Sequence, residues 1–246
     1  MARKVPAGMV LAALYMGNAG LCPSLAAQAS PGAKSALVDA VIEAHGGADR
    51  ISGIRSLRLE GMLVAVNGGN HGKLYRISQG EGTLSMMVEY PDRIELRILE
   101  DGRGWRGDGP ATLAEVQGPL LGAMVLQSAR AFLPMVLADH RDDTVLEHSD
   151  STTAVLTVTL TPELSLRLWM DPDTHLITRS ESILAAGPMT IAFATDYADY
   201  RMVDGVAFPF REQTFAQGVP TASTLIESVE INPEGPRTLL PIPEAR

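Results

Sequence analysis

The sequence predicts a mainly β fold of the α+β class, with an antiparallel sheet as its principal element. From residue 56 onward, apolar and polar residues alternate with period two in many short segments, which is typical of strands that bury one face. Asp204-Gly205 separates two runs rich in aromatic and β-branched residues. This dipeptide favours the type I′ turn of a two-residue hairpin, because Gly adopts positive φ without a steric penalty.

Residues 1–29 have the pattern of an export leader. Arg3 and Lys4 precede an apolar run, and Ala27-Gln28-Ala29 places small residues where a signal peptidase reads them. We therefore expect cleavage before Ser30. A retained membrane anchor is the alternative, although the Gly and Pro residues in the run make it a poor membrane helix. Lipidation of Cys22 is a second alternative, disfavoured because a large Leu precedes that cysteine.

Charge and cysteine usage exclude several functions for the expected mature chain. Without the leader, the 20 basic residues fall to 18 against 29 acidic ones, so the formal net charge changes from −9 to −11. Such a charge disfavours nucleic acid as a partner. The single cysteine lies in the leader, which excludes disulfides and thiolate chemistry from the remainder. We expect one domain over 30–235, followed by a proline-rich tail over 236–246.

The N-terminal part of the domain is predicted to be helical and then to change to strands. Apolar residues recur at helical spacing over 35–45, Gly46-Gly47 ends the helix, and a second helical turn is expected over 48–54. The period then changes to two. Strands are predicted over 57–65, 73–79, 83–90, 93–100 and 103–106.

The segment 118–137 interrupts the strands. It is apolar, has Arg130 as its one charge and contains Pro134, so we predict one kinked helix or two short ones. Its apolar residues fall on more than one face, which indicates burial on several sides or contact with a ligand. Strands then resume over 153–161, 163–170, 176–184, 189–201, 206–215 and 221–231.

Several of these segments resemble a known family, the periplasmic lipoprotein-carrier (LolA/LolB-like) superfamily of outer-membrane lipoprotein-sorting proteins. The resemblance is carried by Gly46-Gly47 after the first helix, the strand 56–61, the segment 168–177 (Leu-Trp-Met-Asp-Pro-Asp-Thr-His-Leu-Ile), Asp199-Tyr200-Arg201, Val203-Asp204-Gly205-Val206, Pro209 and the strand end 229–232. It implies a strongly curved antiparallel sheet, an open half-barrel covered by helices. In that family the concave apolar face holds acyl chains.

With this resemblance, the apolar positions predict a ligand cavity. Eight of the 11 methionines follow residue 29, and Met adapts to ligands of irregular shape. Ordinary filling of a β core is the alternative explanation for the methionines. The cavity is predicted to be lined by Leu84, Met86, Val88, Leu96, Ile98, Met124, Phe132, Leu166 and Leu168, under a cover formed by 118–137.

No motif in the chain predicts catalysis, a cofactor or a metal. The five histidines form no His-x-x-x-His pair, and His45 at a helix end favours an interaction with the helix dipole. His140-Arg141-Asp142-Asp143 is typical of a solvated loop, and Asp171-Pro172-Asp173-Thr174 of a turn. No nucleophile–base pair is visible, so the sequence predicts a protein that is not an enzyme.

The sequence therefore predicts a periplasmic, non-catalytic carrier or binding protein that sequesters a lipid or an acylated protein in an apolar concave cavity. Apolar burial of about 0.8 kcal/mol per CH₂ would drive binding, and a single acyl chain would bind reversibly. The alternative is an envelope interaction or sensor module that binds a protein or peptide without transporting lipid. The expected location is the periplasm, with association with the membrane left open.

Overall fold

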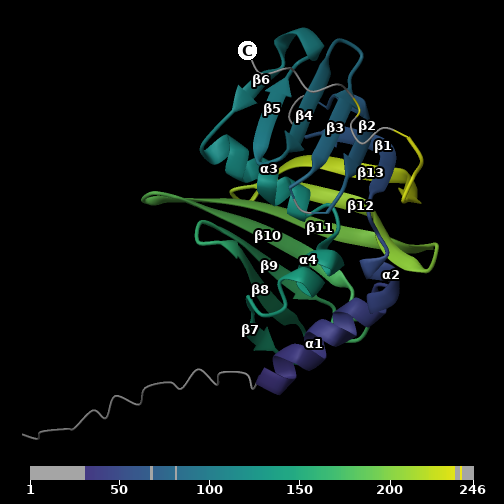
Figure 1. Ribbon diagram of the computed structural model, residues 1–246, viewed down its shortest axis with the longest axis vertical. Coiled ribbons are helices and arrows are strands. Elements are labelled where there is room, and N and C mark those ends of the chain that lie inside the picture. Colours follow the sequence, from purple (N-terminus) through teal and green to yellow (C-terminus); the bar gives the residue numbers. More distant parts are fainter. Residues whose placement is uncertain (1–30, 67–68, 81, 236–238, 240–246) are drawn as a thin grey trace, which may run out of the picture.

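The computed structural model describes residues 31–66, 69–80, 82–235 and 239. The predicted leader lies outside these residues, and so does the predicted tail except for Leu239. The described chain forms one 13-stranded antiparallel sheet with a few helices, as the sequence predicted (Figure 1). Its strands are β1 Leu57–Ala65, β2 His71–Ser78, β3 Leu84–Glu89, β4 Ile94–Glu100, β5 Arg103–Gly107, β6 Ala114–Val116, β7 Thr144–Ser149, β8 Ala154–Thr161, β9 Leu164–Met170, β10 Ile177–Ala186, β11 Met189–Val203, β12 Val206–Ala216 and β13 Val219–Ile231.

The sheet consists of two meanders joined at its centre. The strand order is β6-β5-β4-β3-β2-β1-β13-β12-β11-β10-β9-β8-β7, so strands adjacent in the sheet are also adjacent in sequence, except at the β1–β13 contact. We call β1–β6 the first wing and β7–β13 the second wing. The sheet is not closed, since β6 and β7 are its two edges, and the wings turn sharply relative to one another (Figure 1).

A glycine lies at the centre where the wings join. The β1–β13 register shifts between Glu60 and Gly61. A Cβ at Gly61 would lie 2.3 Å from the Leu225 carbonyl oxygen and 3.0 Å from the Ile226 Cα. Both obstacles are backbone, so no side-chain rearrangement could make room. The glycine in the strand 56–61 is therefore required by the close approach of β13.

The predicted Asp204-Gly205 hairpin is present and contacts the first helix. Val203 pairs with Val206, and Asp204 and Gly205 have φ of 49° and 79°, the positive values that a type I′ turn requires. The Ala207 amide donates to the His45 carbonyl at 3.1 Å, and a Cβ at Gly46 would lie 2.6 Å from the Gly205 carbonyl oxygen. The helix-ending glycines and the hairpin therefore form one packed unit.

The described chain has four α-helices, α1 Pro31–Ala44, α2 Ala48–Ser52, α3 Pro119–Ala129 and α4 Leu133–Asp139, and a 3₁₀ turn η1 at Pro110–Thr112. Val38 and Val41 of α1 are fully buried in the same core as Leu156, Leu166 and Leu168 of β8 and β9. In Figure 1, α1 and α4 lie in front of this wing and α3 lies between the two wings. The core of the domain is therefore centred on the helix-covered half of the sheet.

The segment 118–137 contains two helices, one of the two predicted arrangements. Helices α3 and α4 are bent by 97° across a short break. Pro134 lies in the first turn of α4, where a missing N–H leaves no helical hydrogen bond unmade. Within the described residues, no single helix is long and apolar enough to cross a membrane; only this bent pair passes, on length and composition.

Both edge strands were missing from the sequence prediction. Strand β6 has three residues, and most side chains of β7 are exposed or half-buried. An edge strand has one neighbour and little buried face, so its sequence does not show the alternation that identified the central strands.

Candidate functional site

A cavity of about 390 Å³ lies on the concave side, between the first wing and the strands β11–β13. Its size falls within the range of about 300–1,000 Å³ that is usual for small-molecule sites. The lining residues come from β1–β4, α3 and the residue after it, and β11–β13: Leu63, Ala65, Leu74, Arg76, Met86, Val88, Tyr90, Arg93, Glu95, Arg97, Gln127, Arg130, Phe193, Thr195, Tyr197, Glu212, Thr214, Phe215, Ala216, Thr221, Ala222 and Thr224. We call this space the central cavity.

The central cavity has apolar walls on both sides. Leu74, Met86 and Val88 of β2 and β3 line it from the first wing, and Phe193 and Phe215 of β11 and β12 line it from the second. Leu74, Met86 and Val88 are buried, whereas the two phenylalanines are half-buried. Two sides of an apolar chain placed between these walls would be removed from contact with water, which favours binding.

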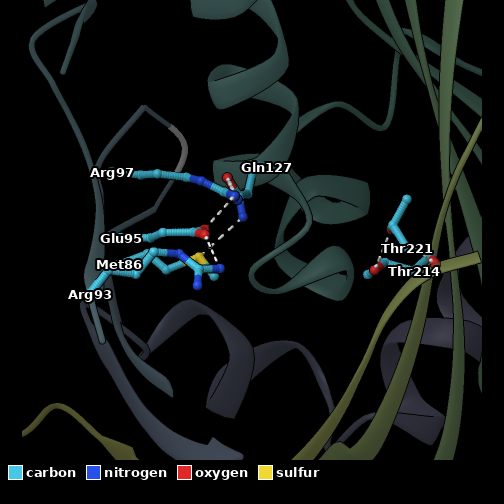
Figure 2. A network of polar contacts seen from close by, with 7 residues as sticks. All are labelled: Met86, Arg93, Glu95, Arg97, Gln127, Thr214 and Thr221. Atoms are coloured by element: carbon cyan, nitrogen blue, oxygen red, sulfur yellow. Dashed lines mark hydrogen bonds and ion pairs between the residues drawn. The ribbon is translucent and has the colours of Figure 1, made fainter. Parts of the chain in front are cut away.

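Polar side chains cross the same space. Figure 2 shows Arg93, Glu95 and Arg97 extending from β4 and its start towards Gln127 of α3, with Thr214 and Thr221 on the other side. The Arg97 guanidinium donates to Gln127 Oε1 at 3.3 Å, and Arg93 pairs with Glu95 at 3.2 Å. The cavity is therefore amphipathic, and charged groups occupy part of its wall.

A second polar cluster lies deeper, where the two wings meet. The Arg76 guanidinium of β2 lies 3.1 Å from the Glu212 carboxylate of β12, and both side chains are largely buried. Arg130, just after α3, donates to the Thr195 hydroxyl at 3.4 Å. The Tyr197 hydroxyl lies 2.8 Å from Ser180 Oγ, and burial raises the pKa of Tyr197, so its phenol stays neutral. We call Arg76, Arg130, Tyr197 and Glu212 the polar partition.

The polar partition separates the central cavity from a smaller apolar pocket. All four of its residues line both spaces. The smaller pocket has a volume of only about 40 Å³ and lies under the segment Ala131–Pro134 at the start of α4. Phe132 lines it and packs against Phe208, with ring centroids 5.1 Å apart. The room for a ligand is thus beside the first wing and not beneath α4.

His45 lines the smaller pocket and is not arranged for acid–base work. Its Nδ1 hydrogen-bonds the Val41 carbonyl at 2.8 Å, its ring packs edge-on against Tyr200, and its Nε2 has no hydrogen-bond partner. Burial lowers the pKa of His45, so the ring is neutral near pH 7. The predicted dipole partner is instead a core histidine. Among the described residues, no three His, Cys, Asp or Glu side chains lie close enough to hold a metal ion.

The structure separates the predicted cavity residues into distinct environments. Met86 and Val88 line the central cavity, and Phe132 lines the smaller pocket. Leu84 and Met124 pack with Leu99 in a small core of their own. The other predicted residues lie elsewhere: Leu166 and Leu168 are fully buried in the main core under the helices, Leu96 borders a shallow pocket near β5 and α3, and Ile98 is buried.

Strand register explains why the β4 residues differ from the expectation. Met86 pairs with Arg97 and Val88 with Glu95, so the charged positions of β4 share the cavity face with the apolar positions of β3. Leu96 and Ile98 therefore face the opposite side of the sheet, because successive strand residues alternate. Leu96 and Ile98, and not the charged residues of β4, were the ones expected at the cavity. The alternation was visible, but the side that becomes concave was not.

Three solved structures share this architecture. A DUF1329 family protein from Desulfovibrio piger superimposes with a TM-score of 0.51 at 13% identity, over 80% of this chain and 92% of that one. A putative outer membrane lipoprotein-sorting protein domain from Vibrio parahaemolyticus gives 0.51 at 9% identity, over 81% and 93%. A LolA superfamily protein from Nitrosomonas europaea gives 0.52 at 12% identity, over 82% and 94%.

The protein has a LolA-like fold. The resemblance expected from the turns and strands is thereby confirmed at the level of fold. No protein-family model matches the sequence, and no curated protein does. The central cavity of this LolA-like fold lies on the concave face of its curved, open sheet.

Proposed function

We propose that this protein is an exported, periplasmic carrier or binding protein that sequesters a lipid or an acylated ligand in the central cavity. The observation that carries the proposal is an open space of about 390 Å³ with apolar walls on the concave face of a LolA-like sheet. A structure with the same fold comes from a putative lipoprotein-sorting protein domain, which supports the same class of ligand. The mechanism is sequestration without chemistry.

The cavity lining supports reversible binding. Burial of an acyl chain against Leu74, Val88, Phe193 and Phe215 would contribute about 0.8 kcal/mol per CH₂, a gain that falls short of irreversible capture for one chain. Helix α3 contacts both wings, so it is positioned to respond to a bound chain. Gly122 lets this helix pack closely on β10, because a Cβ there would lie 3.0 Å from Leu184 Cδ1.

The direct test is titration of delipidated protein with dansyl-undecanoic acid, with probe fluorescence as the readout. Mass spectrometry of the lipids that co-purify with the protein complements it. We expect saturable binding at micromolar probe. Ala222→Trp places an indole among the cavity walls and should weaken binding at least tenfold. Ala185→Trp, on an exposed position of β10, is the matched control and should bind as the unmodified protein does.

Absence of saturable binding and of any co-purified lipid would refute the proposal. Probe binding that Ala222→Trp leaves intact would also refute it, since the probe would then lie elsewhere. The alternative of an envelope protein- or peptide-binding module is tested by pull-down from envelope extract with the same two variants. A protein partner retained by Ala222→Trp, without lipid binding by the unmodified protein, would favour that alternative.

A further inference from the structure

The central cavity is positively charged in an acidic protein. Its lining contains four arginines (Arg76, Arg93, Arg97 and Arg130) and two glutamates (Glu95 and Glu212), so its formal charge is +2. The whole chain carries −9. A concave site with one sign of charge and low-dielectric walls concentrates ligands of the opposite sign. The arginines therefore favour an anionic ligand in this cavity, although the protein as a whole is acidic.

The two glutamates are already engaged by arginines other than Arg130. Glu212 pairs with Arg76 at 3.1 Å, and Glu95 pairs with Arg93 at 3.2 Å and with Arg97 at 3.9 Å. Among the ion pairs of residues 31–66, 69–80, 82–235 and 239, none includes Arg130; its hydrogen bond is to the neutral Thr195 hydroxyl at 3.4 Å. Arg130 thus has no carboxylate at ion-pair distance, and Glu212, which is paired with Arg76, acts on its charge only from farther away.

Arg130 is also poorly solvated. Burial is the main cause that lowers its pKa; electrostatic interactions with Tyr197 and Glu212 act in the opposite direction, and the neighbouring Arg76 lowers the pKa further. A guanidinium nevertheless stays protonated, so the charge remains, partly removed from water. An anionic group that hydrogen-bonds this guanidinium would relieve the unfavourable desolvation. The planar fork of Arg matches a carboxylate or phosphate with two parallel N–H···O bonds.

We propose that the ligand of the central cavity is an anionic amphiphile, whose carboxylate or phosphate group is bound by Arg130 at the polar partition while its apolar tail lies between Leu74, Val88, Phe193 and Phe215. The inference rests on the proposed function and specifies its ligand class. Arg130 lies at the inner end of the cavity, where the polar partition borders the smaller pocket, and the apolar walls begin beside it. Headgroup and tail therefore have adjacent, chemically distinct positions.

The test compares four probes by isothermal titration: dodecanoate, dodecyl phosphate, 1-dodecanol and dodecylamine share one tail and differ in headgroup. We expect the two anions to bind at least tenfold more tightly than the alcohol, and the amine to bind most weakly. Acetate and inorganic phosphate test for a free oxyanion as the ligand. Neither should bind measurably at the concentrations that saturate the site with dodecanoate.

Variants of Arg130 test whether this residue causes the preference for anionic probes. Arg130→Gln should reduce affinity for dodecanoate at least tenfold and leave dodecanol within twofold, whereas Arg130→Lys should retain part of the preference. Arg211→Gln is the matched control, since Arg211 is exposed and adjacent to Glu212 on the opposite face of β12. Unchanged dodecanol binding also shows that Arg130→Gln is folded.

The outcomes separate this inference from the proposed function. Equal binding of dodecanoate and dodecanol, or an anion preference that survives Arg130→Gln, would overturn the role of Arg130 and leave lipid binding standing. Binding of acetate or phosphate as tight as that of dodecanoate would overturn the amphiphile. Failure of all four amphiphiles to bind would refute the proposed function itself, and the inference with it.

Discussion

The ion pair between Arg76 and Glu212 should be worth several times more to stability than a surface pair of equal length. The Arg76–Glu212 contact measures 3.1 Å, with side chains 15% and 10% exposed. Arg58–Glu230, between β1 and β13, also measures 3.1 Å, but its side chains are 25% and 55% exposed. The two pairs therefore differ mainly in burial, which makes the second a natural control.

The magnitude follows from the consequence of leaving a buried charge alone. Removing one partner of a buried pair typically costs about 3–5 kcal/mol. This pair borders the central cavity, so we expect a cost near the lower limit, about 3 kcal/mol, for Arg76→Met or Glu212→Leu. The double variant leaves neither Arg76 nor Glu212 without its partner, so its loss should be well below the sum of the two single losses. We expect a coupling free energy of about 2 kcal/mol, compared with about 0.2–1 kcal/mol for Arg58–Glu230.

The assay is urea unfolding followed by circular dichroism on the four members of each double-mutant cycle. Unfolding slopes that agree across the variants would establish that free energies are comparable. Additive losses for Arg76→Met and Glu212→Leu, within about 0.5 kcal/mol, would refute the view that these side chains form a desolvated pair. A coupling no larger than that of Arg58–Glu230 would do the same.

Three further predictions concern stability. Gly61→Ala should lower the free energy of unfolding by about 3 kcal/mol in urea, because its Cβ meets backbone, whereas Gly32→Ala in α1 has open space and should be neutral or stabilising. Phe132→Ala should lower it by about 3–5 kcal/mol and enlarge the smaller pocket, measurable by binding of an apolar dye. Burial lowers the pKa of His45, so below about pH 6.5 the unfolded state binds a proton that the native state does not bind. The free energy of unfolding should therefore fall by up to about 1.4 kcal/mol per pH unit as the pH decreases. This pH dependence should be absent in His45→Leu and retained in His148→Gln.

The strands and turns were predictable because their causes are local. Asp204-Gly205 specifies a hairpin whatever surrounds it, and the alternation in β3, β4 and β9 follows from a face that must be buried. The break before α4 was predictable from Pro134, although its position three residues upstream was not. Edge strand β7 was missed because few of its residues are buried.

The binding site was only partly predictable. Met86 and Val88, two of the residues expected at a ligand cavity, line the central cavity because they share one face of β3. The arginines of the cavity were not expected there, because an alternating charged face such as Arg93, Glu95 and Arg97 is equally compatible with solvent. The pairing of Met86 with Arg97 decides which face of β4 is concave, and that register depends on the turn between the strands.

Local sequence features thus account for the antiparallel sheet, the broken helix, the glycines that end α1 and the Asp204-Gly205 hairpin. The meeting of Arg76 with Glu212 depends instead on sheet curvature. Successive pairs lead from Glu212 through Thr224 and Leu63 to Gly72, four residues from Arg76, so a flat sheet would separate the two by about 14 Å across the strands and about 13 Å along them. Only the sharp turn at the β1–β13 contact brings their side chains to 3.1 Å. The cavity and its charge arise from that turn. The sequence does not show the turn, because sheet curvature is the sum of small twists over many residues.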